Sequence, residues 1–515
     1  MNNKKQIINI VNFIRAEKGR EAEEGSPYVN YLETTLSEVE LVEKYELAAT
    51  YLFQYDALID PRYTEPFMAL DNERVELGLW FEIPMELCLD AGLKWTGEYR
   101  WDYHCHCNCP IGYTKKERYL LVDQAFEKFK SVFGYYPRTV GAWLFDAATL
   151  RYMSEKYDID AFCNCKEQFG TDGYTLWGGY YGQAYYPSKI NQFLPAKSED
   201  TQINVPMFRM LGCDPIYQYD SGLDLTKDSY RQDVISLEPV YPESGGSPRW
   251  VDWYLRQNFN GECLSFGYAQ AGQENAFGWD RIKAGLRDQL PKFKRLAREG
   301  RLTVETMGAS GRWYKSQYST TPASAISCHG AYDDDEKDTV WYCTKKYRIN
   351  LYGKSGNFRI RDIHVFDENL PCPYEDAVCT ENSCTFEALP IMDGNAYSGN
   401  GILAGIFFKN ADGEDIKYDE MTFSDLGGGE AEVDFGETRF HLFENGFEIK
   451  RSGSFCAEFK AGKTSRRFPK ININSQKREV KFTYQQVDYS ANVEIGNISD
   501  DGFITSDNGI IKIIF

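Results

Sequence analysis

Acidic residues that accompany several short apolar runs suggest where this chain could do chemistry. Each stands within or just beyond the end of a run that we predict to be a strand: Glu82, Asp146, Asp214, Asp220, Glu274 and Glu305. If those strands are parallel and form a barrel, their carboxyl ends meet at one mouth. Two facing carboxylates are what cleavage of a glycosidic bond needs, one as the acid and one as the nucleophile or base. A lone acid at a strand end is more often a helix cap. A catalytic role is therefore indicated only if several of these acids meet at one mouth.

The segment RWDYHCHCNCPIGY, residues 100–113, holds two of the five histidines and three of the fourteen cysteines. In an extended chain the histidines would point to one face and the cysteines between them to the other, so one metal could take at most two of these side chains. No C-x-x-C pair is present. We therefore expect no metal and no cofactor, with a structural metal as the alternative. The segment is interpreted as a loop at the barrel mouth whose Trp101, Asp102 and His104 contact substrate.

A second stretch, residues 172–193, is rich in aromatic residues. It contains Tyr174, Trp177, Tyr180, Tyr181, Tyr185, Tyr186 and Phe193, together with four glycines. Aromatic faces stack on sugar rings, and Tyr and Trp add a polar edge that can hydrogen-bond hydroxyl groups. We expect a loop that lines a sugar-binding cleft, with Asp172 and Trp177 at the substrate. The alternative is a loop folded over the barrel for packing.

Composition limits the classes of partner. The formal net charge of -20 argues against nucleic acid and anionic membranes. No run of eighteen apolar residues is present, and the opening IINIVNFI is interpreted as a strand rather than a signal peptide. Unpatterned cysteines in a chain of this size indicate reduced, buried thiols, and hence a cytoplasmic protein. The sequence leaves the oligomeric state open.

The pattern of apolar and polar residues differs between the two parts of the chain. Up to residue 325, short apolar runs alternate with helical stretches, which predicts an α/β fold with a deformed (β/α) barrel of seven or eight strands. One helix is well punctuated, because Thr114 and Glu117 form a capping box at its start and Gly134 follows its end. The acidic segment 333–338 suggests a boundary. Residues 340–515 alternate polar and apolar positions between turns, which predicts an antiparallel β-sandwich.

The fourth predicted strand and its continuation, VGAWLFDAATLRYMSEKYDIDAFCNC, resemble a unit of two related enzyme groups. These are the NodB-type polysaccharide deacetylases and glycoside hydrolase family 57, which share a deformed seven-stranded (β/α) barrel. In the hydrolases this place reads roughly G-x-W-L-x-E, with the Glu as nucleophile. Gly141, Trp143 and Leu144 match, and Asp146 stands at the Glu position. The resemblance implies that Asp146 is the nucleophile and that Trp143 lies at the substrate.

A second stretch, AGQENAFGWD, resembles the hydrolase signature D-[AG]-E-x-F-G-x-W, whose Asp is the general acid/base. Phe277, Gly278 and the nearby Trp279 match, whereas Gln273 stands at the Asp position. Glu274, one residue further on, is the only carboxylate there. The resemblance implies that Glu274 is the acid/base and that Gln273 and Trp279 lie beside the substrate.

The upstream half resembles the deacetylases, but without their metal ligands. VELGLWFEIP is similar to E-I-G-x-H-x-x-x-H, yet Trp80 and Pro84 stand where the two metal-binding histidines would be. The first strand also lacks the deacetylase aspartates. The chain is therefore more similar to the glycosidase branch. As a whole it also resembles a bacterial family to which no activity has been assigned.

These observations predict a carbohydrate-active enzyme, most simply a retaining glycoside hydrolase or transglycosidase. Asp146 would attack the anomeric carbon, and Glu274 would protonate the leaving oxygen and later activate water. The acids Glu82, Asp214, Asp220 and Glu305 would hold sugar hydroxyls or orient the catalytic pair, and Arg15 would bind an anionic group of the substrate. Two alternatives stay open: a metal-dependent polysaccharide deacetylase with relocated ligands, and a glycan-binding protein on an inactive enzyme scaffold.

Overall fold

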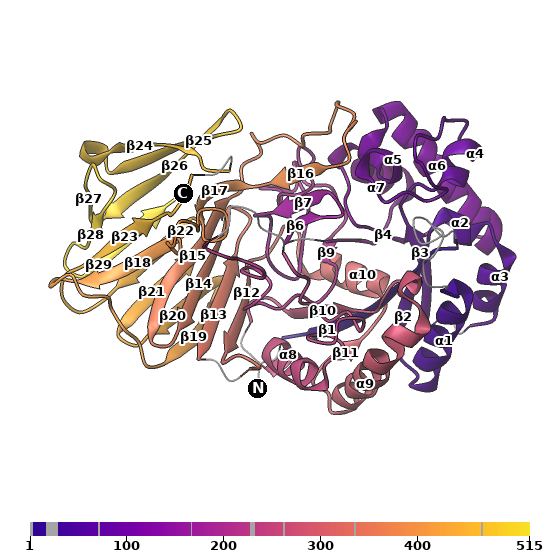
Figure 1. Ribbon diagram of the computed structural model, residues 1–515, viewed down its shortest axis with the longest axis horizontal. Helices are drawn as coiled ribbons and strands as arrows, with labels where there is room; N and C mark the ends of the chain where they lie inside the picture. The colour runs from indigo at the N-terminus through magenta and orange to yellow at the C-terminus, as the bar shows by residue number, and fades with distance from the viewer. Residues whose placement is uncertain are drawn as a thin grey trace.

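The computed structural model describes residues 4–16, 29–70, 73–165, 167–226, 232–260, 263–333, 336–464 and 467–515. Figure 1 shows two halves: one in which helices surround a parallel sheet, and one built from layered antiparallel strands. The first part of the chain is therefore mixed α/β, and the second part is built mainly from antiparallel strands.

A curled, mostly parallel sheet organises the first half. Its strands run in the order β10 (Gly267–Ala271), β1 (Gln6–Ile14), β2 (Ala49–Phe53), β3 (Val75–Trp80), β4 (Thr139–Ala142), β5 (Ala161–Asn164), β9 (Met207–Arg209) and β8 (Ala184–Tyr185). Only β8 pairs in the antiparallel sense, with β9. The edges approach each other beyond β9, where the Gly212 N–H donates to the Gln270 carbonyl on β10 at 2.9 Å. The sheet is a curled, incompletely closed form of the predicted barrel.

The predicted strand that carries Glu305 lies outside the main path of the sheet. β11 (Thr303–Val304) pairs with Ile7 and Ile8 in the first half of β1 and lies off the main path of the sheet. All nine residues of β1 are buried, because helices cover one face of the sheet and the opposite face lines its interior. The apolar run at the start of the chain is therefore a central strand.

One helix of the first half begins and ends where the sequence predicts. α6 (Lys115–Phe133) begins with the capping box of Thr114 and Glu117 and ends at Gly134, whose φ of 84° is left-handed. The others are α1 (Tyr31–Lys44), α2 (Tyr55–Leu58), α3 (Pro61–Thr64), α4 (Met85–Asp90), α5 (Cys105–Asn108), α7 (Ala147–Tyr157), α8 (Pro248–Asn260), α9 (Trp279–Arg298) and α10 (Met307–Gln317).

Two antiparallel sheets form the second half. One runs β12 (Ser324–His329), β13 (Lys337–Cys343), β14 (Tyr347–Lys354), β15 (Asn357–Val365), β18 (Gly405–Asn410), β23 (Phe455–Lys460), β28 (Ile504–Thr505) and β27 (Asn497–Ile498), with β17 (Leu389–Asp393) paired to β15. The other runs β19 (Met421–Gly427), β20 (Glu430–Phe435), β21 (Thr438–Phe443), β22 (Gly446–Lys450), β29 (Ile510–Ile514), β26 (Val487–Ile495), β25 (Glu479–Tyr484) and β24 (Lys470–Asn474). Phe358 and Phe435 stack between the two sheets with ring centroids 4.9 Å apart.

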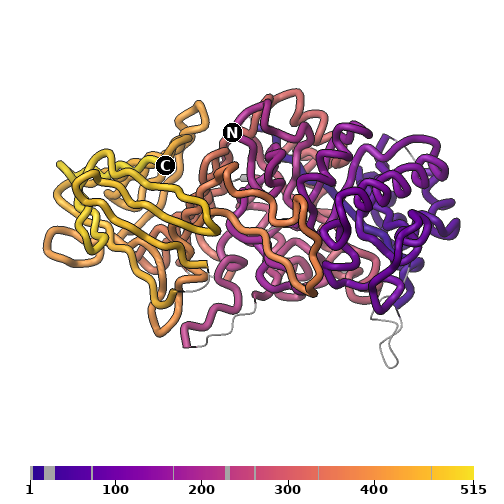
Figure 2. The backbone as a smooth tube through the Cα atoms, turned by 90° about the horizontal axis from the view of Figure 1, so that it is seen from above, coloured from indigo at the N-terminus to yellow at the C-terminus, as the bar shows by residue number. Residues whose placement is uncertain are grey.

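The two halves interlock. The antiparallel sheet already starts at β12, before the acidic segment 333–338, of which residues 334–335 lie outside the described residues. Further on, the chain returns to the first half, where β16 (Cys384–Glu387) pairs with β7 (Tyr174–Trp177), itself paired with β6 (Gln168–Thr171). Figure 2 shows this orange excursion lying across the magenta part of the chain. Each half therefore contributes to the surface of the other.

Candidate active site

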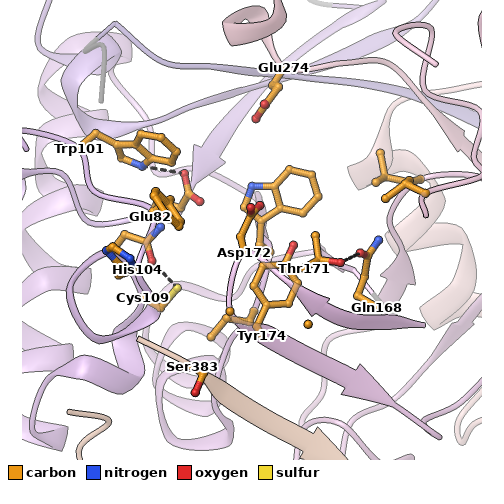
Figure 3. A pocket seen from close by; sticks show the side chains of 18 of the residues that line it. Glu82, Trp101, His104, Cys109, Gln168, Thr171, Asp172, Tyr174, Glu274 and Ser383 are labelled. Atoms are coloured by element: carbon orange, nitrogen blue, oxygen red, sulfur yellow. Dashed lines mark hydrogen bonds between the residues drawn. The ribbon is translucent and has the colours of Figure 1, made fainter. Parts of the chain in front are cut away.

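A cavity of about 760 Å³ opens at the carboxyl ends of the parallel strands. Arg15 follows β1, Glu82 follows β3, Trp143 follows β4 and Glu274 follows β10, and all four line this cavity. Asn382 and Ser383, just before β16, add a wall from the second half of the chain. Figure 3 shows the side chains that face this space. The strand-end rule therefore locates the cavity, and the excursion completes it.

Arg15 joins two acids on the cavity floor. Its Nη2 and Nε donate to Glu82 Oε2 at 2.7 and 3.1 Å, and its Nη1 pairs with Glu274 Oε2. Trp101 stacks on the guanidinium at 4.3 Å and donates from Nε1 to the same Glu82 oxygen at 3.2 Å. Although burial opposes the charge, Glu274 and Glu82 raise the pKa of Arg15, so the guanidinium stays protonated.

Hydrogen bonds between the end of β1 and the turn after β10 explain why Glu274 lies beside Arg15. The Asn275 side chain accepts from the Arg15 N–H at 3.1 Å and donates to the Arg15 carbonyl at 2.8 Å. The Phe13 N–H also donates to the Gln273 carbonyl at 3.3 Å. The end of β1 is thereby fixed against the turn after β10, which places Glu274 beside Arg15.

A further carboxyl group, Glu238, comes from the irregular segment between β9 and α8. It lines the cavity yet is only 3% exposed. Ser236 donates to its Oε2 at 2.8 Å, and Gln273 donates from Nε2 to its Oε1 at 3.1 Å. Burial raises the pKa of Glu238 to about 7, and the nearby charge of Glu274 acts in the same direction. Near neutral pH this residue can therefore carry a proton and also lose it.

Asp102 and His104 form a pair at the cavity wall. Asp102 Oδ1 contacts His104 Nδ1 at 2.7 Å, and the carboxylate also accepts the N–H groups of Glu98 and His104. Although burial raises it, these hydrogen bonds and the His104 ring hold the pKa of Asp102 below its usual value. His104 lines the cavity, whereas Asp102 orients it from behind.

The cysteines of the same segment are mostly structural. Residues 105–108 form the short helix α5 rather than an extended chain, so the expected alternation of faces is absent. Cys105 Sγ lies 3.9 Å from Cys379 Sγ in the excursion, and Cys107 Sγ donates to the His104 carbonyl at 3.1 Å. Of the three cysteines of this segment only Cys109 lines the cavity. Within the described ranges, no group of three or more His, Cys, Asp or Glu side chains has an arrangement that could hold a metal ion.

Solved structures give the fold a context. A protein of Parabacteroides distasonis, described as a glycoside hydrolase/deacetylase, aligns at a TM-score of 0.56 and 16% identity, over 75% of this chain and 90% of that one. This chain therefore has the glycoside hydrolase/deacetylase fold. A polysaccharide deacetylase of Mycobacterium smegmatis aligns at a TM-score of 0.34 and 11% identity, over 62% of this chain and 93% of that one. A GH57-type branching enzyme of Pyrococcus horikoshii gives 0.32 and 10%, over 61% and 70%. No family model and no curated protein matches the chain.

On this glycoside hydrolase/deacetylase fold, the predicted site residues separate into two groups. Those that line the cavity are Arg15, Glu82, Trp101, His104, Trp143, Asp172 and Glu274. Those that lie outside its lining are Asp102, Asp146, Trp177, Asp214, Asp220, Gln273, Trp279 and Glu305. The structure thus brings Glu274 to the site but not the residue predicted as its catalytic partner.

Asp146 is a buried helix cap in this structure. It is the N-cap of α7, accepts from the Thr149 N–H and Oγ1 at 2.9 and 2.7 Å, and pairs with Arg118 at 3.1 Å. Neither it nor Arg118 has any exposed side-chain surface. A nucleophile must reach the substrate, so the sequence-based role of Asp146 does not fit its place in the fold.

Three other acids are occupied elsewhere. Asp214 accepts the N–H groups of Ile216 and Tyr217 and the indole N–H of Trp250. Asp220 pairs with Arg361 of β15 at 3.0 Å, so the chain after β9 docks on the antiparallel half. Glu305 pairs with Lys5 at 2.8 Å, because β11 lies beside the first half of β1 and ends far from the cavity. Each is a correction to the expected convergence.

The aromatic stretch packs rather than binds. Trp177 is 1% exposed, donates from Nε1 to Asp393 Oδ2 at 3.0 Å and lies 5.0 Å from the ring of Tyr219. The other aromatic residues of this stretch are buried as well. Only its first residues, Asp172, Gly173 and Tyr174, reach the cavity. The position of Trp177 therefore favours the packing alternative over contact with substrate.

The residues of the second hydrolase-like signature also lie partly inside and partly outside the cavity lining. Phe277 lines the cavity, whereas Trp279 begins α9 outside it. Gln273 is fully buried and supports Glu238 from behind. Sequence reasoning missed Glu238, Tyr241, Asn382 and Ser383, since none follows a strand of the parallel sheet. No described helix is both long and apolar enough to cross a membrane.

Proposed function

We propose that this chain is a carbohydrate-active enzyme that cleaves or transfers a glycosidic bond in the cavity around Arg15. The observation that carries the proposal is the meeting of three carboxyl groups from separate segments, Glu82, Glu238 and Glu274, on one concave site. Their environments differ, which is the usual basis for dividing acid and base roles between similar side chains.

Glu238 is the proposed general acid. Burial raises its pKa to about 7, which suits a group that must give up a proton near neutral pH. Gln273, which stands at the acid position of the resembling hydrolase motif, donates to the Glu238 carboxyl. In this proposal the general acid is supplied by Glu238, outside the motif, and the Gln273 side chain at the motif position orients it.

Glu274 is the proposed nucleophile, or the base that activates water. Its side chain is 12% exposed while Glu82 is 2% exposed, so Glu274 is the better placed of the two to touch an anomeric carbon. Glu82 and Arg15 position it. A retaining reaction needs acid and nucleophile carboxyl groups about 5–5.5 Å apart, whereas roughly 6.5–9.5 Å leaves room for water and gives inversion. Proton NMR of the first product formed from a cleaved glycan distinguishes these outcomes.

The test is a screen of oligosaccharide hydrolysis with matched variants. Glu238→Gln and Glu274→Gln should each lower turnover by roughly 10²–10⁴-fold while the protein stays folded. Glu305→Gln is the control, because it makes the same change at a partly buried acid outside the cavity. Turnover that survives in both cavity variants would refute the assignment.

A glycan-binding protein without turnover is the second candidate. One observation favours it: both Glu82 and Glu274 are already paired with Arg15, which would have to release Glu274 for chemistry. Binding of glycans with no product in the screen, and unchanged binding in Glu238→Gln, would support this alternative.

A further inference from the structure

The cavity continues into a second hollow. A cavity of about 1090 Å³ adjoins it. The two share the lining residues Gly170, Thr171, Asp172, Val234, Tyr241 and Phe277. Together they form a groove that runs from Arg15 past Asp172 towards Tyr332.

Acidic side chains predominate among the described charged residues that line this groove. The exposed acids Asp172, Asp233 and Glu243 line its outer part. No Lys, Arg or His occurs among the described residues that line that part. In the inner part Arg15 is engaged by Glu82 and Glu274. Because most of its donors are used, Arg15 is poorly placed to bind an anionic group, contrary to the sequence-based expectation.

The floor of the groove holds an unsatisfied acceptor. Glu82 lines the cavity with its side chain 2% exposed. Among the described residues its Oε1 has no hydrogen-bond partner, while Oε2 accepts from Nε and Nη2 of Arg15 and from Nε1 of Trp101. A buried carboxylate oxygen without a donor is costly, so such an atom in a cavity points to a ligand that supplies one. Hydroxyl and ammonium groups both qualify.

From these observations we infer the substrate class: an oligosaccharide that carries protonated amino groups, rather than an acidic or a neutral glycan. The inference rests on the proposed function, since it names the substrate of the same site. Ammonium groups are attracted by the acids of the groove, whereas the carboxylates of a uronic acid are repelled. The aromatic residues Tyr241, Phe277 and Tyr332 provide faces for sugar rings, which a linear polyamine or basic peptide would not need.

Isothermal titration calorimetry at slightly acidic pH tests this directly. The probes are a fully deacetylated chitosan hexasaccharide, its fully N-acetylated counterpart, a hexagalacturonate and a lysine hexapeptide. The amino oligosaccharide should bind on the order of tenfold more tightly than the acetylated one, and the galacturonate should not bind measurably. Its affinity should fall as NaCl rises from about 0.05 M to about 0.5 M, because exposed charges are screened.

Variants connect the binding to the groove. The double change Asp233→Asn and Glu243→Gln should reduce the preference for the amino oligosaccharide severalfold, and Glu437→Gln, an exposed acid on the second half, should leave it unchanged. Equal affinity for the acetylated oligomer, or equally tight binding of the lysine peptide, would overturn the inference. Hydrolysis of a neutral glycan with no amine preference would leave the proposed function standing. Amine-dependent binding without any turnover would support the inferred ligand class and contradict the proposed enzymatic function.

Discussion

Two buried arginines each hold a pair of acids, and their surroundings differ. Arg348 donates from Nε and Nη2 to Asp362 at 2.8 and 2.9 Å and from Nη1 to Glu167 at 2.5 Å, in the seam between the halves. Arg15 holds Glu82 and Glu274 in a similar way. The Arg348 cluster has essentially no exposed surface, whereas the Arg15 cluster lines a cavity. Paired carboxylates are therefore not enough to mark a site, since access to a cavity is what separates the two.

The largest expected effect is on the closed cluster. Arg348→Met leaves two buried acids without their cation and should lower the free energy of unfolding by roughly 3–5 kcal/mol. Arg15→Met should lower it less, because water in the cavity can solvate Glu82 and Glu274. Chemical denaturation of both variants makes the comparison. Equal losses would contradict the distinction between a closed and an open cluster.

Two tryptophans extend the comparison from charge to ring packing. Trp177→Ala should lower the free energy of unfolding by about 3–5 kcal/mol, as expected for a buried Trp. The remaining folded protein should bind glycan as before. Trp101→Ala should instead weaken glycan binding by about 1 kcal/mol, because its ring faces the cavity. Thermal unfolding and calorimetry on both variants measure these quantities, and the reverse pattern would restore Trp177 as a recognition residue.

Glu238 should make stability depend on pH. Its pKa is raised from 4.5 to about 7 in the folded protein, so the folded state binds the extra proton between these values. Stability from this group is complete below pH about 4.5 and falls by roughly 3 kcal/mol as pH rises through about 7. Glu238→Gln should flatten that part of the curve. Unfolding at several pH values measures it, and an unchanged slope in the variant would show that Glu238 titrates normally.

Chelation is expected to have the smallest effect. The positions that resemble metal-binding histidines hold Trp80, which stacks on Phe13 at 4.1 Å, and Pro84, which caps α4. Treatment with EDTA should therefore change neither the melting temperature nor any glycan turnover. Stoichiometric zinc in washed protein, with activity lost on its removal, would favour the deacetylase alternative.

The elements could be predicted better than the site. Apolar runs and caps predicted β1 and α6 because those signals are local, as the capping box of Thr114 shows. The end of a strand can also be recognised locally, which is why Glu82 and Glu274 were among the candidates. Asp146 had the same strand-end signal, but it caps α7 through Thr149 and pairs with the buried Arg118 of α6. The cap is the usual role of an acid at a strand end, whereas the pairing with Arg118 leaves no mark in the residues next to Asp146.

The residues that were missed have a related cause. Glu238 lies in a segment without regular structure, and Ser383 belongs to an excursion that pairs with β7, more than 200 residues earlier in the chain. Trp177 shows the opposite error, since the antiparallel half buries a stretch whose composition is typical of a binding loop. For Ser383 and Trp177, the second half of the chain determines which side chains of the first half are exposed.

A crystal structure of the Glu238→Gln variant with a bound chitosan oligosaccharide tests the central claim most directly. The account predicts a glycosidic oxygen within hydrogen-bond distance of residue 238, with Glu274 facing the adjacent anomeric carbon and amino groups beside Asp172 or Asp233. An oligosaccharide bound elsewhere, with the cavity around Arg15 empty of sugar, would contradict it.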